Sequence, residues 1–261
     1  HETSDMHAFM ASDGQSFWIA NNGTGIISVI AADGSPSKFQ PPSSVLNVGA
    51  GITGIVNNPT TAFVIGPAGN RAAALMLVAS ESGQIFAINP NVSATPQVVI
   101  DRSSAGAIYK GLAVYTASDG SPRLAATDFH NGVIEVWDGN FQPIAALFVD
   151  PSLNRGLAPF NVVAAAGKVY VTYAVQDADA EDDVRGVGNG RIDVFDIDGN
   201  FISTLLDGDR LNAPWGIVEA TSAFGNGLDR QLIVGNFGDG TLLIMDPSSG
   251  ANSRMLDTNG N

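Results

Sequence analysis

The chain has 261 residues, 44% of them hydrophobic, and a formal net charge of −14 from 26 acidic and 12 basic side chains. A field of that sign repels phosphate backbones and anionic lipid, so nucleic acid and membrane surfaces are excluded as expected partners. The sequence holds no cysteine, which excludes disulfides, thiolate metal ligands and cysteine nucleophiles. No apolar run reaches the roughly 20 residues that cross a bilayer, so we expect no membrane insertion.

One sequence pattern recurs five times along the chain. Each copy has an apolar run, a short polar turn, and then a glycine followed by alternating apolar residues, which is typical of a β-hairpin. The five glycines are Gly25, Gly83, Gly132, Gly190 and Gly240, spaced 49 to 58 residues apart. A Gly-rich apolar run precedes each hairpin and a further short strand follows it, so each copy predicts four strands.

Four short strands repeated at this spacing predict an all-β chain with the β-propeller fold. We expect one domain over residues 1–261, with blades at about 1–48, 49–106, 107–155, 156–211 and 212–261. A β-sandwich is the alternative, but it does not require the same hairpin five times in order. Five blades could close a ring, or a sixth could lie beyond the chain end or come from another chain. Exposed strand edges of an incomplete ring would favour self-association.

Several stretches carry a family resemblance. They are FWIANNGTG at 17–25, GVIEVWDGNFQP at 132–143, the segment 156–177, GNGRIDVFDIDG at 188–199, LNAPWGIVEA at 211–220 and LIVGNFGDGTLLIMDPSSG at 232–250. In this order they resemble a family of bacterial secreted propellers with no established activity, and more loosely NHL-repeat and gluconolactonase-type propellers. The resemblance implies a propeller followed by a further blade, and it adds no reaction. Together with a start at His1 rather than Met, it leads us to expect an extracytoplasmic or secreted protein.

An acidic segment at 176–190, QDADAEDDVRGVGNG, interrupts the fourth hairpin, where the other copies have a tight turn. It carries five carboxylates within seven positions: Asp177, Asp179, Glu181, Asp182 and Asp183. Carboxylates are the ligands that Ca²⁺ prefers, so we expect these side chains to hold Ca²⁺, although the pattern departs from an EF-hand loop. The alternative is a solvated acidic loop with no ion.

The N-terminus offers a second candidate metal site. The amine and imidazole of His1, with His7 as a further nitrogen ligand, could chelate Cu²⁺ if His1 is the true mature start. A frayed terminus that leads into the first strand is the alternative.

Polar residues of the predicted turns would lie at one face of the propeller, where an unidentified ligand is expected. They are Asn21, Asn22, Glu81, Asp128, His130, Asn131, Asn236 and Asp239. Tight turns also select Asn, Asp and Gly for their backbone conformation, which is the alternative explanation. A channel metal of the gluconolactonase type would need inner-strand ligands, for which the sequence offers Asn57, Lys110, Asn161 and Glu219.

The expected function follows mostly from missing motifs. The sequence has three histidines, no Gly-x-Ser-x-Gly elbow and no cofactor loop. We therefore expect a non-catalytic binding or structural propeller without an organic cofactor. Two alternatives stay open: a metal-dependent hydrolase or lactonase of the gluconolactonase type, and a subunit of an extracellular assembly.

Overall fold

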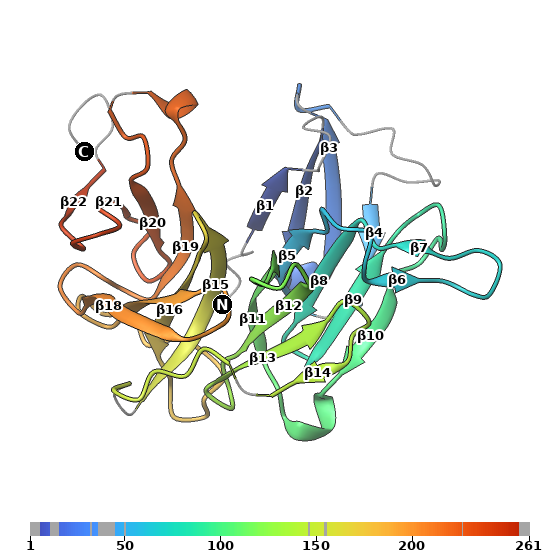
Figure 1. Ribbon diagram of the computed structural model, residues 1–261, viewed down its shortest axis with the longest axis horizontal. Helices are drawn as coiled ribbons and strands as arrows, with labels where there is room; N and C mark the ends of the chain where they lie inside the picture. The colour runs from blue at the N-terminus through green and yellow to red at the C-terminus, as the bar shows by residue number, and fades with distance from the viewer. Residues whose placement is uncertain are drawn as a thin grey trace. The chain divides into compact units, whose positions relative to one another are not determined.

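A computed structural model describes residues 6–10, 16–31, 33–35, 45–49, 51–145, 147–153, 156–225 and 227–255. They form five four-stranded antiparallel sheets, which are the blades of a β-propeller (Figure 1). The all-β prediction and the five predicted blades are therefore confirmed. Helical structure in the described part of the chain is confined to three short 3₁₀ turns, Asn22–Thr24, Ser103–Ala105 and Ser222–Phe224.

The strands follow the predicted repeat order. The first sheet holds β1 (Met6–Met10), β2 (Ser16–Asn21), β3 (Ile26–Ala31) and β4 (Val45–Asn47). The second holds β5 (Ile52–Asn57), β8 (Met76–Ser80), β9 (Gln84–Ile88) and β10 (Gln97–Asp101). The third holds β11 (Tyr109–Thr116), β12 (Pro122–Asp128), β13 (Val133–Asp138) and β14 (Pro143–Ile144). The fourth holds β15 (Leu157–Ala165), β16 (Lys168–Val175), β17 (Arg191–Asp196) and β18 (Phe201–Asp207). The fifth holds β19 (Pro214–Glu219), β20 (Leu232–Asn236), β21 (Leu242–Met245) and β22 (Asn252–Arg254).

The second blade contains an element that the repeat pattern does not predict. A small hairpin, β6 (Val64–Ile65) and β7 (Ala72–Ala73), is inserted between β5 and β8. Phe63, directly before β6, is fully buried although its φ is +57°. The insertion explains why β8 and not the next strand in sequence pairs with β5.

The chain divides into two compact units. Unit 1 comprises 1–131 and 135–145, and unit 2 comprises 132–134 and 146–261. The expectation of one domain stays a prediction. In unit 1, Trp18, Ile52 and Met76 belong to one hydrophobic cluster, and Phe63, Tyr109 and Trp137 belong to another. In unit 2, buried residues of β16, β17, β20 and β21 form a further cluster, with Leu211 and Ile217.

The first strands of four blades share an irregularity. In β5, β11, β15 and β19 the antiparallel register shifts near the start of the strand, as in a β-bulge. Polar side chains at two of these bulges bind the first strand of the next blade in the same unit. Thr53 Oγ1 donates to the Tyr109 carbonyl at 2.6 Å, and Asn161 Nδ2 donates to the Trp215 carbonyl at 2.7 Å.

None of the described helical segments has the length and apolar character needed to cross a membrane.

Candidate functional site

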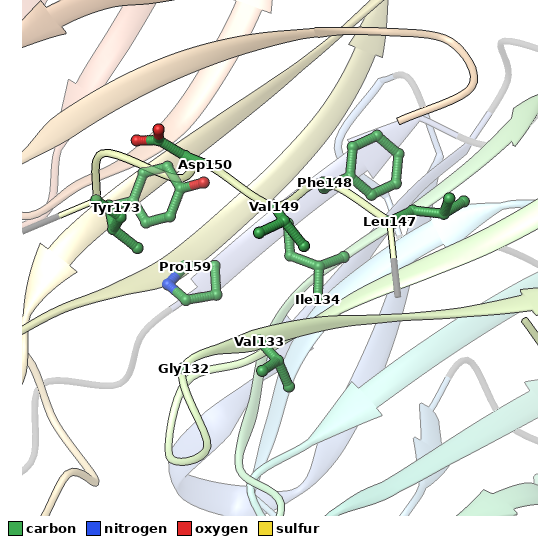
Figure 2. A pocket seen from close by; sticks show the side chains of 10 residues that line it. Gly132, Val133, Ile134, Leu147, Phe148, Val149, Asp150, Pro159 and Tyr173 are labelled. Carbon is green, nitrogen blue, oxygen red and sulfur yellow. The ribbon is translucent and has the colours of Figure 1, made fainter. Parts of the chain in front are cut away.

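A pocket with a volume of about 210 Å³ lies in unit 2 (Figure 2). Its walls come from the start of β13, the segment 147–153, β15 and β16. The lining residues are Gly132, Val133, Ile134, Leu147, Phe148, Val149, Asp150, Leu153, Pro159 and Tyr173. Most of these side chains are apolar, and Figure 2 shows Asp150 beside the ring of Tyr173 at one end of the row. We call this cavity the unit-2 pocket.

The segment 147–153 is fixed to the fourth blade at Phe148. The backbone N–H of Phe148 donates to the Gly199 carbonyl at 3.0 Å, and its ring meets the Phe195 ring edge-on at a centroid distance of 5.5 Å. Phe148 is itself 4% exposed. Because this anchor precedes Asp150 by two residues, it sets the position of the Asp150 carboxylate next to β17.

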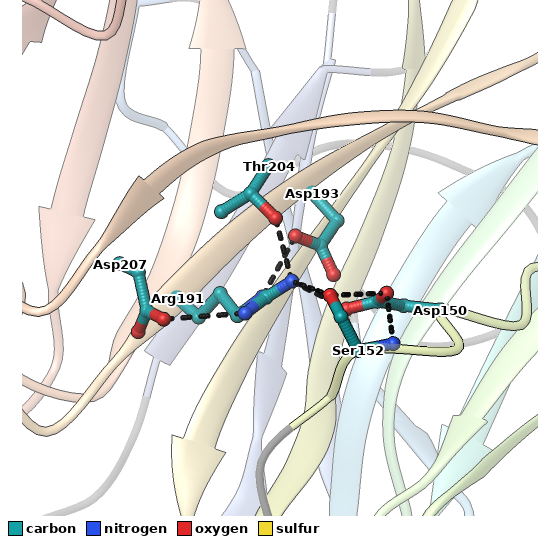
Figure 3. Close-up of polar contacts among 6 residues, drawn as sticks. All are labelled: Asp150, Ser152, Arg191, Asp193, Thr204 and Asp207. Carbon is teal, nitrogen blue, oxygen red and sulfur yellow. Dashed lines mark hydrogen bonds and ion pairs between the residues drawn. The ribbon is translucent and has the colours of Figure 1, made fainter.

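A buried cluster of polar groups surrounds Arg191 on β17 (Figure 3). We call it the Arg191 network, and it comprises Asp150, Ser152, Arg191, Asp193, Thr204 and Asp207. Arg191 Nη2 donates to Asp150 Oδ2 at 2.5 Å, Thr204 Oγ1 at 2.5 Å and Ser152 Oγ at 3.0 Å. Its Nε donates to Asp193 Oδ1 at 2.9 Å, and Nη1 donates to Asp207 Oδ2 at 3.2 Å.

The three carboxylates of the network differ in burial. The side chains of Asp150 and Asp193 are fully buried, whereas that of Asp207 is 45% exposed. Asp150 also accepts hydrogen bonds from the backbone N–H and the hydroxyl of Ser152, at 2.7 and 2.8 Å. Each nitrogen of the Arg191 guanidinium therefore has an acceptor in the network, and water reaches the network at Asp207 and at Ser152.

Burial and charge move the pKa values of these groups in different directions. Desolvation raises the pKa of Asp193 to about 6 although Arg191 favours its ionised form. Desolvation also opposes ionisation of Asp150, but Ser152 and Arg191 outweigh it and lower its pKa. The pKa of Tyr173 is raised by burial and then by the nearby carboxylates of Asp193 and Asp150, so its hydroxyl stays protonated.

The pocket and the network share Asp150, and Tyr173 contacts both. An apolar cavity that ends at buried charged groups with shifted pKa values is the usual form of a ligand site. The arrangement supplies apolar walls, aromatic rings and a fixed negative field. We therefore regard the unit-2 pocket with the Arg191 network as the candidate functional site.

Sequence reasoning missed this site. Asp150, Arg191 and Asp193 were not among the candidate residues, because the first two lie 41 positions apart in the chain. One local signal was present: Arg191 and Asp193 alternate on β17, so their side chains share a face of the sheet. Two oppositely charged residues on one face of an otherwise mostly apolar strand indicate a paired polar cluster.

The acidic segment 176–190 forms a hairpin extension between β16 and β17. Gln176 and Asp183 form an isolated bridge, and the Asp177 N–H donates to the Asp182 carbonyl at 2.9 Å. A carboxylate oxygen of Asp177 accepts the Glu181 N–H at 2.9 Å, which lowers the pKa of Asp177. The side chains of Asp179, Glu181 and Asp182 are exposed.

The other half of this segment is anchored to the fifth blade. Gly186 N–H donates to Asn212 Oδ1 at 2.7 Å, and the Arg185 guanidinium lies over the Phe237 ring at 5.9 Å from its centroid. Within the described residues, no group of three or more His, Asp or Glu side chains is placed to hold a metal ion. The Ca²⁺ site at 177–183 stays a prediction, since it needs the exposed carboxylates to converge.

The remaining metal candidates have different outcomes. His1 lies outside the described residues, and only the backbone of His7 is described, in β1, so the Cu²⁺ site stays a prediction. Among the inner-strand candidates, Lys110 Nζ binds Glu81 at 2.6 Å and Asn161 binds the Trp215 carbonyl. These contacts join neighbouring blades and involve two of the four inner-strand candidates, and the gluconolactonase-type channel metal stays a prediction.

Two of the turn residues expected at the propeller face, Asp128 and Asn236, accept hydrogen bonds from backbone N–H groups. Asp128 Oδ1 accepts N–H groups of Ile108 at 3.1 Å and Asn131 at 3.2 Å. Asn236 Oδ1 accepts the Asn212 N–H at 3.0 Å. These two residues thus fix the chain as it enters the first strand of their blades, as turn chemistry explains, and the ligand at the propeller face stays a prediction.

No protein-family model matches the chain. The chain is 32% identical over 198 residues to an uncharacterized protein of Acanthamoeba polyphaga mimivirus, a match that covers 73% of this chain and 36% of that one. It is 30% identical over 259 residues to a second uncharacterized protein of the same virus, which covers 95% of this chain and 63% of the relative. The chain thus spans about a third to somewhat under two thirds of the length of these relatives.

Solved β-propeller structures resemble the chain in fold. Virginiamycin B lyase from Staphylococcus aureus matches with a TM-score of 0.59 and 12% identity, over 100% of this chain and 72% of that one. A gluconolactonase from Xanthomonas campestris matches with a TM-score of 0.50 and 15% identity, over 69% of this chain and 57% of that one. The chain is therefore a β-propeller related in fold to lyase- and lactonase-type propellers, as the looser resemblance implied. Bacterial origin and secretion stay predictions.

Proposed function

We propose that this propeller is a non-catalytic binding module whose site is the unit-2 pocket. One observation carries the proposal: a mostly apolar cavity of about 210 Å³ ends at the buried Arg191 network. Ligand pockets combine apolar walls with a few fixed polar groups that orient the ligand, and this cavity has both. Its volume is below the roughly 300 Å³ at which drug-sized pockets begin, so the ligand is small.

The apolar walls of the pocket favour contact with a ligand over contact with water. Val133 and Val149 are 47% and 61% exposed, so two apolar side chains at the pocket face water. A ligand that covers them removes apolar area from water at roughly 25 cal/mol per Å². At the opposite end, hydrogen bonds hold the Asp150 side chain and burial holds the Tyr173 side chain. Neither side chain is therefore free to move into the cavity and fill it.

Binding rather than chemistry is the better match to these groups. The guanidinium of Arg191 and the Asp150 carboxylate use their polar atoms on each other and on Ser152 and Thr204. The lactonase alternative rests on a distant fold match, and fold alone does not transfer an activity. A panel of lactones with added Ca²⁺, Mn²⁺ or Zn²⁺ tests that alternative directly.

Ligand-detected NMR with phenethyl alcohol tests the proposal. This uncharged probe has an aromatic ring and one hydroxyl and is expected to bind the wild-type protein. Val133→Trp places an indole at the pocket and should abolish the signal. Val98→Trp is the matched control, because Val98 on β10 is 48% exposed and does not line the pocket. The proposal would be overturned if the wild type bound neither this probe nor a charged analogue of the same shape, or if both variants lost binding equally.

A further inference from the structure

The charges around the unit-2 pocket do not balance, and this imbalance indicates what the pocket binds. Asp150, Asp193 and Asp207 all form ion pairs with the same guanidinium, that of Arg191. Three carboxylates against one guanidinium leave an excess of negative charge when all are ionised. In the described part of the chain, Arg191 is the basic side chain that ion-pairs with all three.

Part of this negative charge is buried and close to the ligand space. The side chains of Asp150 and Asp193 have no exposed area, and Asp150 lines the pocket. Charges that are removed from water are screened less than surface charges, so their field reaches into an adjacent cavity. Coulomb attraction therefore favours a cation in the pocket over a neutral or an anionic group of the same shape.

Two aromatic rings line the same cavity. Tyr173 and Phe148 are 2% and 4% exposed, and both contribute to the wall. An ammonium group over an aromatic face gains a further cation–π attraction. The Tyr173 hydroxyl stays protonated because burial raises its pKa, so the negative field at the pocket comes from the carboxylates.

We propose that the unit-2 pocket binds a small apolar molecule that carries one protonated primary amine. The apolar part lies against Val133, Ile134 and Leu147, and the amine points toward Asp150 and Tyr173. This inference rests on the proposed binding function and goes beyond it by naming the ligand class. The net charge of −14 acts in the same direction, because it raises the local concentration of cations.

The test compares three probes of nearly the same shape by NMR titration: phenethylamine, phenethyl alcohol and phenylacetate. We expect the amine to bind roughly tenfold tighter than the alcohol, and phenylacetate to bind more weakly than the alcohol. Raising the salt concentration should narrow both differences, because the interaction is electrostatic.

Two variants test whether the preference for the amine comes from the Arg191 network or from the overall charge of the protein. Asp207→Asn removes one carboxylate charge from the network without changing the pocket lining, and should reduce the preference for the amine about threefold. Asp229→Asn removes one exposed charge from the β19–β20 connection of the same unit and should leave the preference unchanged.

The outcomes distinguish this inference from the proposed function. If the alcohol binds but the amine binds no tighter, the ligand class is wrong and the binding function stands. An equal effect of Asp207→Asn and Asp229→Asn would also overturn the ligand class, because the preference would then follow net charge alone. If no probe binds the wild-type protein, the proposed function fails, and the ligand class fails with it.

Discussion

The backbone N–H of Phe63 donates to the carbonyl oxygen of Gly139 at 2.8 Å. Phe148 repeats this bond to Gly199 in unit 2, at 3.0 Å. Both phenylalanines have positive φ, +57° and +60°, and both glycines lie in an Asp-Gly-Asn-Phe turn. The same local device thus anchors the hairpin insertion in unit 1 and the segment that lines the pocket in unit 2.

The close approach at Gly139 predicts a packing penalty. A Cβ atom added at Gly139 would lie 2.8 Å from Ala62 Cβ, closer than van der Waals contact allows. We expect Gly139→Ala to lower the free energy of unfolding by about 1–3 kcal/mol, as overpacking does. Urea denaturation measures the change.

Gly23→Ala is the matched control for Gly139→Ala. The nearest atom to a Cβ at Gly23 is Asn21 Oδ1, at 3.9 Å, so the expected change is within about 0.5 kcal/mol. Gly199→Ala should cost more than Gly139→Ala, because Gly199 also has a φ of +90°. Equal stability of the Gly139 and Gly23 variants would contradict this account of the turn.

The Arg191 network predicts unequal effects for its two ends. Arg191→Met leaves the buried carboxylates of Asp150 and Asp193 without their cation, which should cost about 3–5 kcal/mol of unfolding free energy. Asp207→Asn removes a half-exposed partner and should cost less than about 1 kcal/mol. Chemical denaturation of both variants at neutral pH, with circular dichroism to verify folding, measures the difference. Similar losses of stability for the two variants would show that Arg191 does not stabilise the buried carboxylates more than its exposed partner Asp207 does.

The blades could be predicted from the sequence because their signals are local. Gly25, Gly83, Gly132 and Gly240 have φ values from +64° to +74°, so each turn requires a glycine near its strand. The fourth repeat glycine, Gly190, serves a different purpose: a Cβ there would lie 2.4 Å from Pro214 Cδ. The pattern is the same in the sequence, but in this copy tertiary packing requires the glycine.

The candidate site could not be predicted in the same way. Asp150 belongs to a connection between blades, and it reaches Arg191 through the anchor at Phe148 rather than through a repeat position. The acidic segment, in contrast, can be recognised in the sequence from its closely spaced acidic residues. Whether its carboxylates converge depends on backbone turns such as the one at Ala180, whose φ is +57°, and not on spacing alone.

The raised pKa of Asp193 predicts a pH dependence of stability. Its folded pKa is about 6, whereas an unfolded Asp has a pKa of about 3.9. Between these values the native state binds a proton that the unfolded chain has lost, so this contribution to stability falls as the pH rises. We expect the unfolding free energy of the wild type, relative to Asp193→Asn, to be larger at about pH 4.5 than at about pH 7.5.

Asp246→Asn is a control, because the stability contribution of Asp246 should change with pH in the opposite direction. Hydrogen bonds from the Ser248 hydroxyl and backbone lower the pKa of Asp246, so its contribution is present above about pH 3.9 and is lost as the pH falls further. Urea midpoints of the three proteins across the acidic range measure both effects. Parallel profiles for the wild type and Asp193→Asn would show that Asp193 titrates normally in the native state.

The acidic segment predicts stabilisation by Ca²⁺. For a dissociation constant of about 0.1 mM, typical of weak extracellular sites, about 1 mM Ca²⁺ contributes about 1.4 kcal/mol to the stability of the folded state. A gain of this size raises Tm by a few degrees for a chain of this length. Asp179→Ala should abolish the rise, because Asp179 is exposed on the turn that the Asp177–Asp182 hydrogen bond closes. Asp229→Ala, which removes an exposed carboxylate outside the segment, should keep it. Calorimetry with and without Ca²⁺ measures the shift, and an unchanged wild-type Tm would show that the segment is a solvated acidic loop.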